Sequence, residues 1–356
     1  MFDRLKHILL VVLLWSVVTG CDKTIHEYPG EQNFLLTVRC DARLRAPEYY
    51  STVECNSETG ASYVVRAQGL TMSDTRYSEP VSLRYVVDLY RVTASTSQFV
   101  ERQVHYAEVD AQKPQAVATF RVDAQNYKVL VWCDYVRDDD RKAWYYNTSD
   151  LRHITYTDIA LVDFRYKDAF AAVLDVDLTD FCYMDGHREF VYDIDLVRPS
   201  GKYRCITTDM ADYLKSGRRA EDVTAVVTYT QYVSAGYDVL EQKPNYFEPT
   251  RRYITKARVV EYEGRDALEL CYDYVFVNGN QTNVRLNLEF YDGEVTITES
   301  GDVVGQKISQ WSGIVVPLKR NMETIIEGRM LTTSFGTGGF GIDPSFENEF
   351  VIPWGD

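Results

Sequence analysis

Alternating apolar and polar positions recur along the chain and predict extended strands. Residues 83–90 carry an apolar side chain at every second position, which is the period of a strand with one buried face. Residues 190–197 repeat this alternation, whereas 127–136 are mostly apolar, as is typical of a central strand covered on both faces. The run 223–233 lacks Gly, Pro and charged residues and is rich in β-branched and aromatic side chains, which favours a further strand.

The second half of the sequence contains the clearest local pattern. Three apolar-rich runs within residues 268–300 are separated by Asn278-Gly279 and by Asp292-Gly293. Both dipeptides readily adopt the positive φ angles that tight hairpin turns require. The segment therefore predicts a three-stranded antiparallel meander.

Helical signals are scarce. One short helix is predicted after Asp209, which stands at the N-cap position, with Asp212 in the first turn, Lys215 in the last turn and Gly217 beyond it. Elsewhere helical periodicity is poor, so the fold class expected is all-β with one or two short helices.

A weak internal similarity suggests how the chain is divided. Residues 131–136 resemble residues 270–275, which either reflects two tandem domains of similar fold or a chance likeness between two aromatic strands. We expect a boundary near Asp185-Gly186, which separates an N-terminal domain at 34–185 from a C-terminal domain at 186–356.

The first twenty residues have the pattern of an export signal. Arg4 and Lys6 precede an eleven-residue run at 8–18, apolar except for one serine, which is short for a membrane span and typical of a signal peptide. Cys21 follows directly after Gly20, as in the bacterial lipobox, where the cysteine becomes a lipidated N-terminus bearing acyl chains such as palmitate. We expect cleavage after residue 20 and a polar tether at 21–33.

Composition narrows the classes of function. The chain of 356 residues is 45% apolar and 26% charged, with 27 tyrosines and a net charge of −15. A large folded core is therefore expected, and the negative charge disfavours a nucleic-acid partner. No stretch after the signal approaches the ~20 apolar residues of a membrane helix.

The cysteines leave two alternatives open. Beyond Cys21 the sequence has six, namely Cys40, Cys55, Cys133, Cys182, Cys205 and Cys271. An exported chain permits up to three disulfides, but several of these residues lie in apolar strand-like runs where cysteine behaves as a small buried hydrophobe. We favour mostly free buried thiols.

Motifs for chemistry are weak. Residues 336–341 match the GxGxxG spacing, but Pro344 follows closely and disfavours the helix that a dinucleotide site requires. The run Asp138-Asp139-Asp140 lacks the alternating ligands of a calcium loop. No HExxH, GxSxG or Walker motif occurs. We expect no catalytic residues, no metal site and no cofactor, and hence no enzyme.

Two aromatic segments are candidates for binding. Trp144, Tyr145 and Tyr146 stand beside polar residues and either pack under a loop or contact a glycan or a protein partner. Near the C-terminus, Phe350, Ile352 and Trp354 share one face of a predicted strand. This strand either completes the second domain or is donated to a partner subunit.

Several segments together resemble one family of lipoproteins. They lie at 21–29, 130–136, 146–151, 168–170, 274–279, 316–321 and 341–346. The chain is similar to a group of Bacteroidales lipoproteins of unknown function, which itself resembles fimbrillin-like and fimbrial anchor proteins. The resemblance implies two tandem β-sandwich domains of transthyretin-like type and carries no catalytic residues.

The same resemblance indicates a location and a role. It implies a lipid-anchored protein of the outer membrane, facing the cell surface, that serves as a structural anchor or accessory subunit of a fimbria-like adhesive assembly. The alternative is a surface lipoprotein that binds a glycan or a host ligand. The sequence leaves open which face of the membrane carries the protein and which polymer or ligand it contacts.

Overall fold

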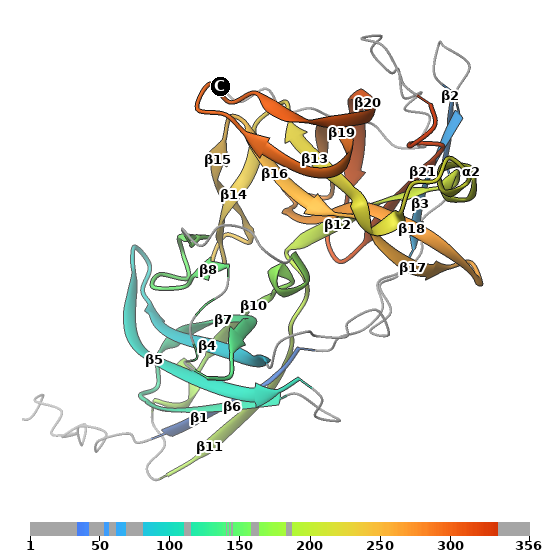
Figure 1. Cartoon of the computed structure of the whole chain (residues 1–356). Helices are drawn as coiled ribbons and strands as arrows, with labels where there is room; N and C mark the ends of the chain where they lie inside the picture. Colours follow the sequence, from blue (N-terminus) through green and yellow to red (C-terminus); the bar gives the residue numbers. More distant parts are fainter. Residues whose placement is uncertain are drawn as a thin grey trace, which may run out of the picture.

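The computed structural model describes residues 34–42, 53–56, 62–68, 81–109, 115–139, 141, 143, 145–157, 164–182 and 187–333. The signal peptide, Cys21, the tether, Trp144, the 336–341 motif and the C-terminal strand with Phe350, Ile352 and Trp354 lie outside these residues. The described chain forms two β-rich bodies, one above the other in Figure 1.

The first body is a sandwich of two sheets. One sheet has the order β11-β1-β6 and the other the order β10-β7-β4-β5. These strands are β1 (Phe34–Asp41), β4 (Val81–Val92), β5 (Ser97–Glu108), β6 (Gln115–Val122), β7 (Asn126–Arg137), β10 (Phe170–Asp177) and β11 (Glu189–Asp195). Strands β4 and β7 are buried over most of their length, as their near-continuous apolar sequence predicts.

The second body is also built from two sheets, with the orders β17-β18-β12-β21-β3-β2 and β16-β13-β19-β20. Its strands are β2 (Val53–Asn56), β3 (Ser62–Gln68), β12 (Ser200–Thr207), β13 (Val223–Tyr229), β16 (Arg251–Lys256), β17 (Arg258–Tyr262), β18 (Arg265–Phe276), β19 (Thr282–Ile297), β20 (Val303–Leu318) and β21 (Glu323–Gly328). Strands β12, β13, β16, β18, β19, β20 and β21 contribute side chains to one apolar core.

A small third sheet joins the two halves of the sequence. Its order is β15-β14-β9-β8. The strands are β8 (Tyr146–Asn147), β9 (Ile154–Tyr156), β14 (Val233–Asp238) and β15 (Lys243–Glu248). Helical structure among the described residues is limited to α2 (Met210–Lys215) and three short 3-10 turns, η2 (Phe164–Lys167), η3 (Thr179–Phe181) and η4 (Ala220–Asp222). The all-β sandwich prediction is therefore confirmed.

The predicted meander over residues 268–300 is wrong. Strand β18 pairs with β12 and β17, whereas β19 pairs with β13 and β20 in another sheet. The turn at Asn278-Gly279 therefore crosses between sheets instead of closing a hairpin. Gly293 does have a positive φ of 86°, but it lies within β19, where the register with β20 shifts. It marks an irregularity inside a long strand.

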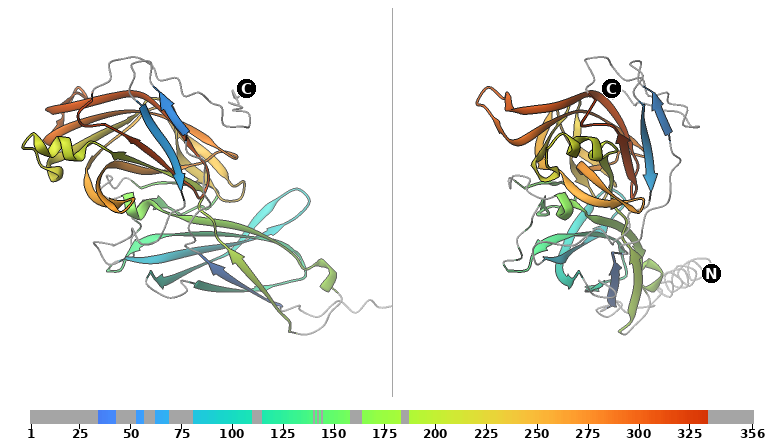
Figure 2. Two further views of the ribbon diagram at one scale, coloured as in Figure 1. Left: turned by 90° about the vertical axis from the view of Figure 1, so that its right-hand side faces the viewer. Right: turned by 45° about the vertical axis from the view of Figure 1, so that its right-hand side comes forward.

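Two further predictions need adjustment. The apolar run at 223–233 is divided between β13 and β14, which belong to different sheets. The domain prediction departs from the pairing at two places: β11 pairs with β1 in the first body, and β3 pairs with β21 in the second. Figure 2 shows β2 and β3 in blue against the second body, away from their neighbours in sequence. Long-range strand pairing thus overrides sequence order.

Candidate functional site

The two bodies are joined by interpenetrating aromatic side chains. Trp132 of β7 is fully buried, and its ring centre lies 5.1 Å from Tyr146, 6.2 Å from Tyr237 and 6.3 Å from Phe276. In the other direction, Phe164 of η2 enters the core of the second body. Each half thus contributes rings to the core of the other, which makes the joint a packed interior and not a hinge.

Buried ion pairs reinforce this joint. Lys167 Nζ lies 2.6 Å from Asp273 Oδ1, and each side chain is 1% exposed. Arg198, between β11 and β12, donates from Nε to Asp168 Oδ1 at 2.8 Å and from Nη1 to Asn321 Oδ1 at 3.0 Å. Burial raises the pKa of Asp168 even though Arg198 opposes this. Breaking one partner of such a pair would leave an uncompensated buried charge, which is strongly destabilising.

Two further ion pairs join residues of β4, β5 and β7 beside the loop around β8. Arg84 binds the buried Asp134 carboxylate with Nε and Nη2, at 2.9 and 2.6 Å. Arg102 binds Asp88 in the same two-pronged manner at 2.6 and 2.7 Å and donates from Nη1 to the carbonyl of Thr148 at 2.8 Å. Burial raises the pKa of both carboxyl groups, and the guanidiniums oppose that effect. These arginines fix the loop onto the sheet.

A polar cavity of about 580 Å³ opens beside Arg84. Its lining is rich in hydroxyl and amide groups. The lining residues are Arg84, Ala143, Tyr146, Asn147, Thr148, Ser149, Thr155, Tyr156 and Thr157. Such a surface offers hydrogen-bond donors and acceptors beside a smaller apolar part.

A second charged group spans the six-stranded sheet of the second body. Glu269 on β18 lies between Arg204 Nε and Arg258 Nε, and Glu323 on β21 lies 2.9 Å from Lys202 Nζ. Burial by itself would raise the pKa of Glu269, but the two guanidiniums together hold it below its usual range. Neighbouring strands are thereby tied through side chains as well as through their backbones.

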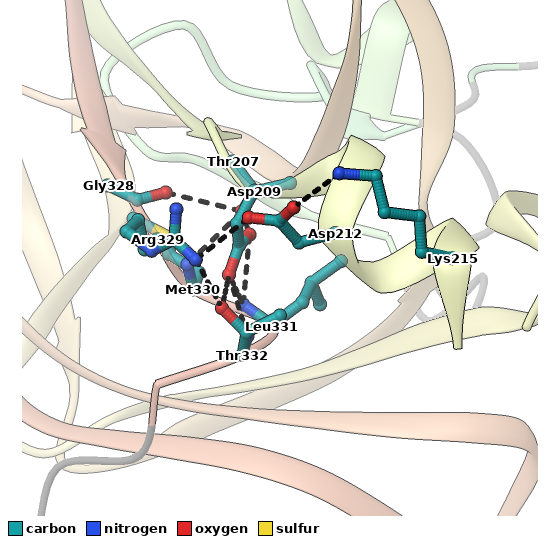
Figure 3. A network of polar contacts seen from close by, with 9 residues as sticks. All are labelled: Thr207, Asp209, Asp212, Lys215, Gly328, Arg329, Met330, Leu331 and Thr332. Carbon is teal, nitrogen blue, oxygen red and sulfur yellow. Dashed lines mark hydrogen bonds and ion pairs between the residues drawn. The ribbon is translucent and has the colours of Figure 1, made fainter.

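The segment after β21 is held by one buried carboxylate (Figure 3). Asp209, 1% exposed, accepts hydrogen bonds from the backbone N–H of Leu331 and from the N–H and hydroxyl of Thr332. It also accepts the Thr207 hydroxyl. The predicted helix is confirmed as α2, but Asp209 makes no side-chain capping bond to it. Its carboxylate anchors a segment more than 100 residues away instead.

The structure places Tyr145 and Tyr146, two of the three predicted binding aromatics, in the interior. Tyr145 is 4% exposed and Tyr146 is 1% exposed, with the Tyr146 hydroxyl donating to the carbonyl of Lys167 at 2.5 Å. Their rings therefore pack between the bodies and do not present a stacking surface to solvent. Of the aspartate run, Asp138 accepts the Ser82 hydroxyl.

Cys40, Cys133, Cys205 and Cys271 are free thiols and are buried, and Cys182 is partly exposed. The prediction of mostly free buried thiols is confirmed for the four buried residues. The described residues contain no cluster of three or more His, Cys, Asp or Glu side chains placed to hold a metal ion. Among them, no helix has both the length and the apolar character that a membrane crossing requires.

Sequence patterns did not identify the buried ion pairs, although a signal was present. Asp88, Asp134 and Asp273 each stand in a strand with an apolar or aromatic residue on either side. A charged residue in such a run is almost never buried without a partner. The partners themselves come from distant segments and cannot be read from local pattern.

Comparison with solved structures gives likenesses of low identity. A candidate cell adhesion protein from Bacteroides eggerthii aligns with a TM-score of 0.37 and 11% identity, covering 87% of this chain and 90% of that one. The fimbrial anchor protein Mfa2 from Porphyromonas gingivalis aligns with a TM-score of 0.36 and 8% identity, covering 79% and 82%. A candidate cell adhesion protein from Bacteroides uniformis aligns with a TM-score of 0.37 and 9% identity, covering 83% and 99%.

A search of curated proteins found no match. A family model matches residues 48–353, which is most of the sequence and includes strands of both bodies. Its description is that of a family of unknown function, DUF6562. The chain belongs to this family.

Proposed function

We propose that the protein is a lipid-anchored lipoprotein of the outer membrane, exposed at the cell surface, that acts as a non-enzymatic anchor or accessory subunit of a fimbria-like adhesive assembly. The N-terminal pattern supports the anchoring: a basic segment and an apolar run end at Cys21, where several acyl chains would give stable membrane attachment. The motif resemblance to fimbrillin-like lipoproteins supports the assembly.

The position of β1 is the observation that carries the structural role. This strand begins at Phe34, only a short distance after Cys21, and it lies between β11 and β6. Seven of its residues pair with β11 and eight with β6. A pull from the lipid along β1 would load both ladders of hydrogen bonds together, because their bonds run across the strand direction. A central strand next to the anchor suits a protein that bears tension.

The joint between the bodies supports the same role. Load that enters through β1 can reach the second body along the chain from β11 into β12, and also across the Trp132 cluster and the Lys167–Asp273 and Arg198–Asp168 pairs. This interface is packed and charge-compensated, so we expect the bodies to move as one unit. A rigid connector is what a membrane-attached base needs.

Lipid attachment can be tested by metabolic labelling with an alkyne-bearing palmitate analogue, followed by membrane fractionation. The native chain should take up the label and sediment with outer membranes. Cys21→Ala should lose both properties, whereas Cys182→Ala, which alters the partly exposed cysteine, should keep them. Label retained by Cys21→Ala would refute anchoring at this residue.

The polar cavity beside Arg84 favours one second candidate, a surface lipoprotein that binds a glycan. Its hydroxyl, amide and guanidinium lining can exchange hydrogen bonds with sugar hydroxyls. Saturation-transfer NMR with neutral and acidic oligosaccharides would test this candidate. Transfer that disappears in Asn147→Ala but persists in Asn245→Ala would support the cavity, and transfer equal in both variants would exclude it.

A further inference from the structure

The Lys167–Asp273 pair differs from an ordinary surface ion pair in its surroundings. Nζ lies 2.6 Å from Oδ1, and both side chains are 1% exposed. The ring centres of Tyr156 and Phe164 lie 4.7 and 5.6 Å from Nζ. The aromatic walls exclude water from the amine and the carboxyl group and hold them against each other, which gives the high effective concentration of an intramolecular reaction.

The carboxyl group of Asp273 is surrounded by hydrogen-bond donors. The Tyr229 hydroxyl donates to Oδ2 at 2.8 Å, and the backbone N–H of Tyr274 donates to Oδ1 at 2.7 Å. Fixed donors of this kind stabilise negative charge that develops on a carboxyl oxygen during attack at its carbon.

A chain of hydroxyl groups continues from this site. The Tyr203 hydroxyl lies 3.0 Å from that of Tyr229 and 2.7 Å from that of Tyr253. Rotating hydroxyl groups can each donate and accept. The chain therefore offers a route for moving protons to and from the carboxyl group without bulk water.

The amine is partly in its nucleophilic form. Burial lowers the pKa of Lys167 to about 8, against the raising influence of Asp273. At pH 7 about one amine in ten is then neutral and carries a free lone pair. In water, with the usual pKa of lysine, this fraction would be far smaller.

We propose that Lys167 and Asp273 condense to form an isopeptide bond that ties the two bodies together covalently. A bond forms between Nζ and Cγ, and one Cγ–O bond breaks. The ammonium group gives up two of its three hydrogens, which leave with the departing oxygen as water. Charge and electrons balance without an oxidant or co-reactant. The bond would link residues 106 positions apart and would reinforce the joint that carries load.

The chain supplies a matched control pair. Lys202 Nζ lies 2.9 Å from Glu323 Oε1, with the side chains 6% and 1% exposed. Glu323 also faces a second cation, because Arg204 Nη1 lies 3.6 Å from Oε2. An arginine thus occupies the second carboxylate oxygen of Glu323, whereas the second oxygen of Asp273 accepts the neutral hydroxyl of Tyr229. We therefore expect no bond at this pair.

Intact mass of the denatured native chain tests the proposal directly. It should fall about 18 Da, one water, below the mass calculated for the processed chain with its lipid. Trypsin should fail to cut after Lys167, and the peptide that contains it should appear joined to the one that contains Asp273. Lys167→Met and Asp273→Ala should each restore the full mass, while Lys202→Met should keep the deficit.

A native chain of full mass with a normal cut after Lys167 would overturn the proposal. Because that measurement is made on the native protein, it holds even if a variant fails to fold. A deficit that persists in Lys167→Met would equally refute it, since another pair would then be responsible.

Discussion

Replacing Asp209 tests how the segment after β21 is held against the second body. Its carboxylate binds the N–H groups of Leu331 and Thr332 and the hydroxyls of Thr207 and Thr332. Replacement by alanine removes every one of these acceptors at a position that is 1% exposed. The change should release the segment that follows β21.

The magnitude follows from the donors left behind. A buried N–H without a partner costs about 1–3 kcal/mol. The amide of Leu331 is buried and that of Thr332 is only partly buried, so the second amide counts for less and the two together predict a loss of about 2–5 kcal/mol. The hydroxyls add less, because the Thr207 hydroxyl can turn to the carbonyl of Gly328, 3.2 Å away. If Asp209 served only as a helix cap, the loss would be nearer ~1 kcal/mol.

Urea denaturation and hydrogen exchange measure the two parts of this prediction. Asp209→Ala should lower the free energy of unfolding within the stated range and speed exchange at the amides of Leu331 and Thr332. Asp209→Asn, which keeps one oxygen acceptor, should have a free energy of unfolding between those of Asp209→Ala and the native chain. Glu221→Ala, at an exposed position in η4 away from this network, serves as control and should leave those amides protected. Unchanged exchange in Asp209→Ala would refute the reasoning.

Three other predictions concern separate parts of the fold. Gly293→Val should lower the melting temperature through a backbone cost of about 1–3 kcal/mol, because φ is +86° and a β-branched residue resists that value. Gly293→Asn should cost less. Equal melting temperatures for the two variants would contradict this prediction. Trp132→Ala should cost about 3–5 kcal/mol in denaturant unfolding, and a loss below ~1 kcal/mol would argue against a packed joint. Glu269→Gln should lose stability at neutral pH. The folded pKa of Glu269 is depressed below 4.5. The native chain should therefore lose its extra stability over Glu269→Gln as pH falls from 4.5 through the folded pKa. A difference in melting temperature between the two chains that stays constant with pH would contradict the pairing.

The local pattern of apolar residues is sufficient to predict a strand that is buried on one face or on both. The apolar run of β7 and the alternation of β4 and β11 correctly predicted strands. Periodicity reports which face of a strand is buried, but it does not name the hydrogen-bonded neighbour. For this reason the local pattern predicts one meander for β18 and β19, although the two strands lie in opposite sheets.

Turn chemistry was similarly ambiguous. The positive φ expected at Gly293 is present, yet a bulge within a strand demands it as readily as a hairpin does. The true reversal between β19 and β20 comes later, where the N–H of Thr298 donates to the carbonyl of Asp302 at 2.9 Å. The Asp-Gly dipeptide therefore predicts the backbone conformation at Gly293, but it does not predict whether that conformation forms a hairpin turn or a bulge.

The joint between the bodies was beyond sequence reasoning because its parts are distant in sequence. Lys167 and Asp273 are 106 residues apart, and Trp132 packs against Phe276 from a different sheet. Asp209 shows the same limit at one residue. Its place before α2 suggested a cap, but a tertiary partner at Thr332 takes the carboxylate.

The central claim is that the protein is a surface anchor that bears load, and retention of fimbrial polymer on cells tests it most directly. Cells producing the native chain and cells producing Cys21→Ala should be compared for polymer in the cell-bound and medium fractions, with Cys182→Ala as control. The account predicts that polymer is shed into the medium only with Cys21→Ala. Polymer that stays cell-bound in equal amount without the lipid anchor would contradict it.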